Sequence, residues 1–149
     1  MKSERILAHL TLAALLAFPM AACNKNLGTI DLSGPIDIQW RMLRVFVQNS
    51  GSSEILVSYK GGTPLRAPAG ERVYLTPYSS VSPLPASDSF SIQRGFATLA
   101  NVSFQPIRLP ETKGETKDTT IVIGEPTEGQ FTATAAEPDW IRIVAVTKP

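Results

Sequence analysis

Residues Ser89–Gln93 read Ser-Phe-Ser-Ile-Gln, and this strict alternation decides the predicted fold. Successive side chains of a β-strand point to opposite faces of the sheet, so Phe90 and Ile92 share one face while polar side chains occupy the other. The stretch therefore predicts a half-buried strand with Phe90 and Ile92 in the core.

Segments rich in β-branched and aromatic residues continue on both sides of this strand, separated by Gly, Pro, Ser and Asn. The further predicted strands are Ile36–Trp40, Leu43–Gln48, Ile55–Tyr59, Val73–Leu75, Val102–Gln105, Thr119–Ile123, Phe131–Ala135 and Trp140–Val146. No convincing amphipathic helix interrupts them. About eight short strands at this spacing predict an all-β fold, namely a small β-sandwich, immunoglobulin-like or transthyretin-like, with a small barrel as the alternative.

Three details refine the predicted strands. A proline cannot donate to a sheet ladder, so we expect Pro77 to end the strand that begins at Val73, and Pro106 to mark a bulge or an edge. Trp140–Val146 is apolar on both faces except at Arg142. That pattern predicts a central strand buried on each side.

The N-terminus has the pattern of an export signal. Lys2 and Arg5 precede a short apolar run from Ile6 to Phe18, and Pro19 ends the helical pattern. A helix over this run, at about 1.5 Å per residue, falls short of a hydrocarbon core of roughly 30 Å thickness. The run is therefore a poor permanent membrane span.

The residues that follow, Met20-Ala21-Ala22-Cys23, resemble the lipobox of bacterial lipoprotein precursors, which usually has Leu or another aliphatic residue where this chain has Met20. The resemblance implies a signal peptide over residues 1–22 and lipid, such as palmitate, on Cys23. An ordinary secretory peptide with a chance cysteine and an uncleaved anchor are the alternatives. Residues 23–35 then form the lipidated cysteine and a tether, and residues 36–149 one β-sandwich domain. By the same resemblance, Asn24 favours the outer membrane, facing the periplasm, in a Gram-negative host.

The composition argues against most enzyme classes. The only His, His9, lies in the predicted signal peptide, and the only Cys is the predicted lipidation site. A Ser-His-Asp triad, a Cys nucleophile, a zinc site and an iron–sulfur cluster all need these residue types, so we predict no metal and no cofactor. Basic and acidic side chains are equal in number after residue 22, so nucleic acid is not an expected partner.

The candidate partner-binding residues lie in Thr76–Ser89, the longest stretch without a predicted element. Long irregular loops are often binding loops, and we expect Tyr78 and Leu84 to be its exposed apolar anchors. A passive crossover between the two sheets is the alternative interpretation. The duplicated Glu-Thr-Lys motif in Pro110–Asp118 is interpreted more simply, as a solvated hairpin loop.

Two pairs of acids could in principle hydrolyse glycosides without histidine, Glu125 with Glu128 and Glu137 with Asp139. Acids this close together in loops are usually solvated. Aromatic side chains could instead form a platform for sugars, and the candidates are Trp40, Tyr59, Tyr74, Tyr78 and Trp140.

Together these patterns predict a membrane-anchored envelope lipoprotein that is not an enzyme. Its predicted role is a protein-binding scaffold or an accessory subunit of a cell-envelope assembly. A module that binds glycan or another surface polymer is the alternative, and a hydrolase that uses carboxylates ranks third.

Overall fold

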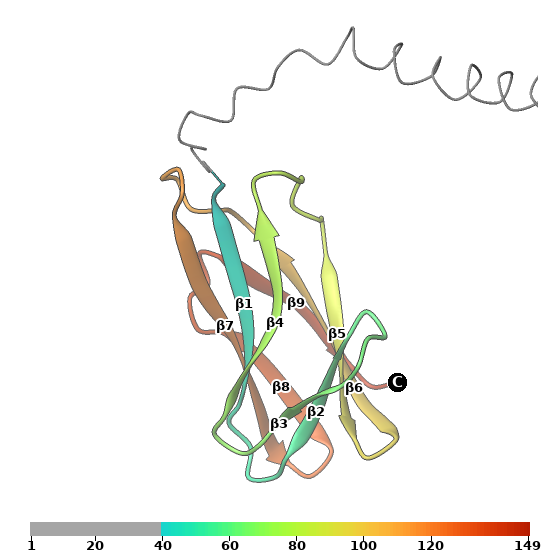
Figure 1. Ribbon diagram of the computed structural model, residues 1–149. Coiled ribbons are helices and arrows are strands. Elements are labelled where there is room, and N and C mark those ends of the chain that lie inside the picture. Colours follow the sequence, from blue (N-terminus) through green and yellow to red (C-terminus); the bar gives the residue numbers. More distant parts are fainter. Residues whose placement is uncertain (1–39) are drawn as a thin grey trace, which may run out of the picture. The chain divides into compact units, whose positions relative to one another are not determined.

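The computed structural model describes residues 40–149. The predicted signal peptide, Cys23, the tether and all but the last residue of the Ile36–Trp40 strand lie outside these residues. Within the described part, nine strands form the fold (Figure 1). They are β1 (Met42–Asn49), β2 (Ile55–Tyr59), β3 (Leu65–Ala67), β4 (Arg72–Ser79), β5 (Asp88–Arg94), β6 (Ala97–Pro106), β7 (Thr116–Thr127), β8 (Gln130–Ala135) and β9 (Ile141–Thr147).

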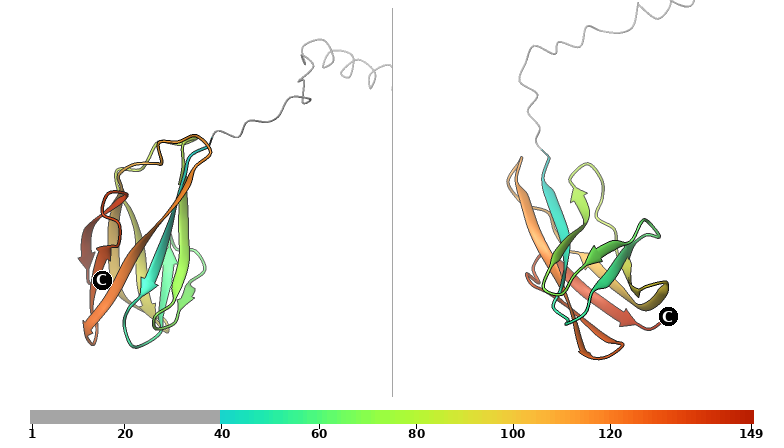
Figure 2. Two further views of the ribbon diagram at one scale, coloured as in Figure 1. Left: turned by 90° about the vertical axis from the view of Figure 1, so that its left-hand side faces the viewer. Right: turned by 60° about the horizontal axis from the view of Figure 1, so that its bottom comes forward.

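The strands form two sheets that pack face to face as layers (Figure 2). The four-stranded sheet has the order β4-β1-β7-β8, and the five-stranded sheet has the order β3-β2-β5-β6-β9. Neighbouring strands are antiparallel except β1 and β7, which run parallel. The sheets do not close into a barrel, so the predicted β-sandwich is confirmed and the barrel alternative is wrong.

The core lies between the sheets and is built by the alternation that the sequence shows. Phe90 and Ile92 of β5 are 2% and 0% exposed, which confirms the predicted inward face of that strand. The ring of Phe90 lies 6.1 Å from that of Phe104, measured between centroids. Leu43 and Val45 of the other sheet belong to the same buried apolar cluster.

Strand β4 is longer than the sequence predicts. It continues through Pro77 to Ser79 and pairs with β1, with a register shift between Val45 and Phe46. Because β4 is an edge strand, its outer side has no ladder to complete, so a proline is tolerated there. The expectation that Pro77 ends the strand is therefore wrong, and the irregular connection shrinks to residues 80–87.

The C-terminal strand is also placed differently. Within residues 40–149, β9 pairs with β6 alone and forms an edge of the five-stranded sheet, so the prediction of a central strand buried on both faces is wrong. Its apolar residue Val144 is 56% exposed, because in a two-layer sandwich only one face of each sheet is covered. Pro106 ends β6, and the register shift lies two to three residues earlier, between Ser103 and Phe104.

The segment with the duplicated Glu-Thr-Lys motif is not a hairpin loop. β6 belongs to the five-stranded sheet and β7 to the four-stranded sheet, so the residues between them cross from one layer to the other. β7 already begins at Thr116, and Asp118 pairs in register with Arg44 of β1.

Candidate functional site

Tyr78, one of the two predicted binding residues, lies in β4 and not in a loop. Its side chain packs against the core, and its hydroxyl group donates a 2.7 Å hydrogen bond to Oδ2 of Asp88. Leu84 lies in the connection between β4 and β5 and is half-buried. Both side chains are half-buried, so the expectation of two exposed anchors is wrong, while partner binding through Tyr78 and Leu84 stays a prediction.

Asp88 is the centre of a buried hydrogen-bond cluster. Its Oδ2 also accepts a 2.6 Å hydrogen bond from the Tyr59 hydroxyl group, and its Oδ1 accepts one of 2.9 Å from the backbone of Ser89. Lys60 Nζ lies 3.4 Å from the carboxylate, whose side chain is only 4% exposed. Tyr59 and Asp88 belong to the five-stranded sheet and Tyr78 to the four-stranded sheet, so the cluster joins the two layers.

The hydrogen bonds decide the ionisation state of this cluster. Burial by itself raises the pKa of Asp88, but the two tyrosine hydroxyl groups, the Ser89 amide and Lys60 outweigh it and hold that pKa below its ordinary value. Burial, followed by the bond to the ionised carboxylate, raises the pKa of Tyr78. The side chains of Tyr59, Tyr78 and Asp88 bond to one another, so this cluster is a structural feature and a poor candidate for ligand binding.

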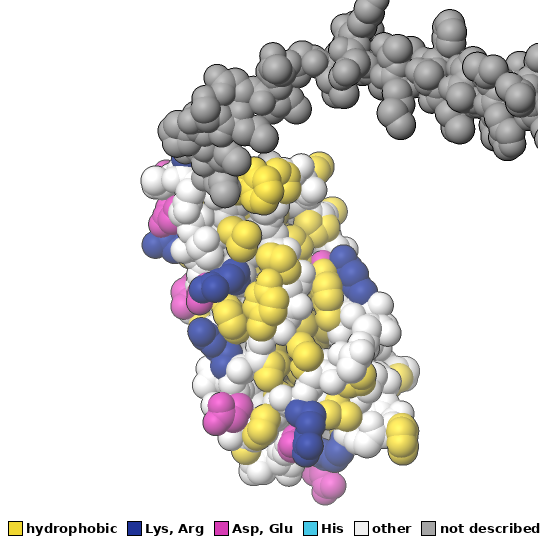
Figure 3. Space-filling view, in the orientation of Figure 1, with side chains coloured by type: hydrophobic (Ala, Val, Ile, Leu, Met, Phe, Trp, Pro, Cys, Tyr) yellow, Lys and Arg dark blue, Asp and Glu magenta, His cyan; other side chains and the backbone are white. Residues whose placement is uncertain are grey.

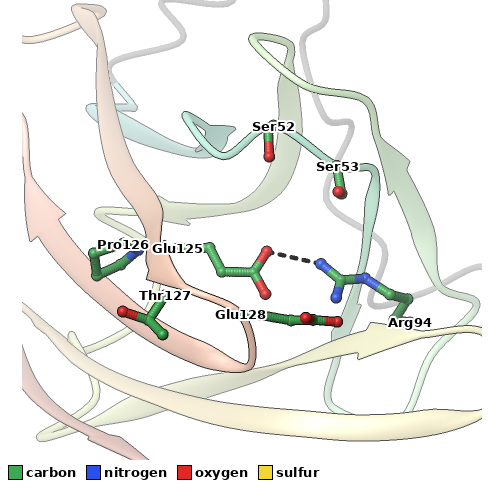
Figure 4. Close-up of a pocket in the computed structure, with 7 residues that line it drawn as sticks. All are labelled: Ser52, Ser53, Arg94, Glu125, Pro126, Thr127 and Glu128. Carbon is green, nitrogen blue, oxygen red and sulfur yellow. Dashed lines mark hydrogen bonds and ion pairs between the residues drawn. The ribbon is translucent and has the colours of Figure 1, made fainter.

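A polar pocket lies where Ser52 and Ser53 face the turn between β7 and β8 (Figure 4). Within it, Arg94 donates a 2.7 Å hydrogen bond to Oε2 of Glu125, and Oε1 accepts one from the amide of Gly129. Burial raises the pKa of Glu125, but the Gly129 amide and Arg94 outweigh it and leave that pKa lowered.

A glycosidase acid needs a carboxyl group whose pKa is raised, and Glu125 has the opposite environment. Glu128 lines the same pocket. The two acids of the other predicted pair have different environments. Glu137 accepts a 3.2 Å hydrogen bond from Thr119, while the side chain of Asp139 is 80% exposed. Within residues 40–149, no group of three His, Cys, Asp or Glu side chains could hold a metal ion.

The outer face of the four-stranded sheet carries an aromatic patch, formed by Phe46, Tyr74 and Arg72. The two rings meet edge to face with centroids 5.5 Å apart, and the Arg72 guanidinium lies 4.1 Å above the Phe46 ring. Tyr74 is 45% exposed, and hydrophobic side chains gather on this face beside basic ones (Figure 3). Of the predicted aromatic platform, only Tyr74 belongs to this patch.

The remaining aromatic candidates lie apart from it. Trp40 is 55% exposed just before β1, and Tyr59 and Tyr78 belong to the Asp88 cluster. Trp140 is half-buried under the guanidinium of Arg108, 4.6 Å from its ring. The predicted platform of five aromatic residues is therefore not assembled.

The strongest candidate is a groove between β8 and β9, which are edge strands of different sheets. Its wall is almost entirely apolar, and Arg142 is the one charged residue in it. The lining residues are Ile107, Ala133, Thr134, Ala135, Pro138, Ile141, Arg142 and Ile143. Sequence reasoning missed this site, although the uncharged segment Gln130–Ala135 was visible as a signal.

The four sheet edges are protected to different degrees. A free edge invites pairing with another chain unless the strand is short, charged, bulged or interrupted by proline. β3 has three residues, β4 has Arg72, Pro77 and a register shift, and β9 has Arg142 and a shift at Val144. β8 reads Gln-Phe-Thr-Ala-Thr-Ala, with no charged residue and no proline, and the register shift in its ladder places the extra residue on β7, between Gly124 and Thr127, and not on β8.

The chain matches no family model, no curated protein and no solved structure. Among the described residues, no helix is long and apolar enough to cross a membrane.

Proposed function

We propose that the protein is a lipid-anchored component of the bacterial cell envelope that binds another protein as a scaffold or accessory subunit. The proposed anchor is lipid on Cys23, and the proposed location is the outer membrane, facing the periplasm in a Gram-negative host. The proposed binding surface is the groove between β8 and β9. No catalytic step and no cofactor form part of the proposal.

The observation that carries this proposal is the unprotected edge of β8 beside an apolar groove. Natural β-proteins normally guard such edges, because an exposed, uncharged edge is an aggregation hazard. An edge left without these features is best explained by a partner that covers it.

The test is crosslinking in intact cells, followed by purification of the full-length protein in detergent. Ile107 is 48% exposed at the groove, and Ile107→Lys should reduce recovery of a defined envelope protein about tenfold or more, as loss of a central apolar contact does. Phe96 is a fully exposed apolar residue in the β5–β6 turn, so Phe96→Lys is the matched control. Equal recovery from both variants would place the contact elsewhere, and Leu84 would be tested next.

A glycan or surface-polymer ligand is the second candidate, and the patch of Phe46, Tyr74 and Arg72 favours it. Exposed rings can stack on sugars, and a guanidinium can donate hydrogen bonds to their hydroxyl or acidic groups. This candidate predicts retention on a polysaccharide column that Tyr74→Ala abolishes. Retention that persists in this variant argues against the patch as the binding site.

A further inference from the structure

We propose that the partner adds an extended strand to the free edge of β8, with a carboxylate placed opposite Arg142. This proposal rests on the proposed protein-binding function and deepens it, because it states the shape and the chemistry of the bound segment. Three observations carry it: the unpaired edge, the apolar groove beside it, and the charge of Arg142.

The first observation concerns the backbone of β8. Within the described residues it pairs with β7 alone, in regular register from Ile121–Ala135 to Gly124–Thr132. Its other side therefore presents a row of backbone donors and acceptors that a further strand can satisfy. β9 is less suited, because its register shift at Val144 breaks the regular spacing of these groups.

The second observation concerns the side chains of the added strand. A strand about 4.8 Å from β8 directs every second side chain into the layer between the sheets. There it meets Ile107, Ile141 and Ile143 of the groove. Apolar side chains at alternate positions, preferably β-branched, fit this surface and the extended conformation.

The third observation is the charge of Arg142, an exposed residue of β9 that lines the groove. The Arg142 guanidinium donates a hydrogen bond to Gln105 Oε1, but no carboxylate of the described residues lies within 4.0 Å of it. A guanidinium has five donors, so most of them stay free for a planar carboxylate. The proposed partner segment therefore carries an Asp or Glu that complements this charge.

The experiment places a photoreactive phenylalanine analogue at Thr134 of the full chain in intact cells. The matched control carries it at Tyr74, an exposed residue of the edge strand β4. We expect at least tenfold more of one envelope protein crosslinked from Thr134. The crosslinked segment, mapped by mass spectrometry, should alternate apolar residues over five or more positions and contain an acid.

That segment, made as a synthetic peptide, tests the geometry directly. Binding should slow hydrogen exchange at backbone amides of β8 and leave those of β4 unchanged. Arg142→Glu should weaken binding about tenfold or more, and a peptide whose acid is replaced by Lys should restore affinity for that variant. The thermal midpoint of Arg142→Glu should stay near that of the native chain, which would show that the variant is folded and that weaker binding is not caused by unfolding.

The outcomes separate the two proposals. A mapped segment that is helical or highly charged, or β8 amides that exchange as before, overturns strand addition while protein binding stands. Capture of a second copy, or of this chain's own residues 24–39, overturns a separate partner at this edge. If no envelope protein is captured with the analogue at Thr134, nor with the analogue moved to Ile107 or to Leu84, both the strand addition and the protein-binding function fail.

Discussion

The hydroxyl group of Tyr78 on β4 donates a 2.7 Å hydrogen bond to the buried carboxylate of Asp88 on β5, and so links the two sheets of the sandwich. The same carboxylate oxygen accepts the bond from Tyr59. A sandwich without disulfides depends on such contacts between layers in addition to its apolar core. The first two predictions test this link.

Tyr78→Phe should lower the free energy of unfolding by about 1.5–3 kcal/mol, the usual range for a hydrogen bond to a charged group. The ring still packs against the core, so only the hydroxyl group is lost. Urea denaturation measures the effect. Tyr74→Phe, on the exposed outer face, is the matched control and should change stability by less than about 0.5 kcal/mol. Equal effects in both variants would show that the link contributes nothing.

The lowered pKa of Asp88 predicts a specific dependence of stability on pH. A carboxyl group whose pKa is lower in the folded state binds more protons when unfolded, so its contribution is present above the unfolded pKa of about 4 and is lost as pH falls through the folded pKa. Unfolding followed from pH 7 to pH 2 should thus show stability falling below about pH 4. Asp88→Asn should be less stable at neutral pH and should lose less on acidification. The exposed Asp139→Asn should retain the native slope, and an Asp88→Asn profile parallel to the native one would contradict the assignment.

Phe90→Ala should cost about 3–5 kcal/mol and Ile92→Ala about 2–5 kcal/mol, because both leave cavities in the core. Chemical denaturation monitored by tryptophan fluorescence gives both values. Phe96→Ala removes a fully exposed ring from the adjoining turn and should cost less than about 0.5 kcal/mol. A Phe90 variant as stable as the Phe96 variant would mean that the register of β5 is wrong.

Cys23→Ser should remove the proposed lipid anchor. The variant is expected in soluble fractions or as an uncleaved precursor, because two or more acyl chains are what make such anchoring stable. Fractionation and intact mass measure location and modification together. Native membrane attachment with native processing would contradict the lipoprotein interpretation.

The alternation of polar and apolar residues was enough to predict the sandwich and its core. The alternation within β5 alone decides that Phe90 and Ile92 face inward, so no distant residue had to be known to predict it. The cluster around Asp88 could not be predicted in the same way, since Tyr59 lies 29 residues before it and reaches it only across paired strands. Tyr78 was misplaced because proline at position 77 usually ends a strand, and the sequence does not reveal that β4 lies at an edge.

The misplacement of β9 has the same physical origin. Apolar residues on both faces of a strand indicate burial only if another layer packs on each face of the sheet, and the layers are decided by tertiary packing. Val144 is exposed at an edge despite its hydrophobicity. The groove beside it arises between strands of different sheets, which no local pattern describes.

The parallel pairing of β1 with β7 has a consequence for how the domain folds. Residues as far apart as Arg44 and Asp118, 74 positions along the chain, must meet before the first strand gains its second neighbour. Closing so long a loop costs entropy before the paired strands can stabilise each other, and folds dominated by such distant contacts fold slowly. A chain delivered N-terminus first therefore keeps β1 incompletely paired until β7 has emerged, so the four-stranded sheet is completed only when nearly the whole domain is present.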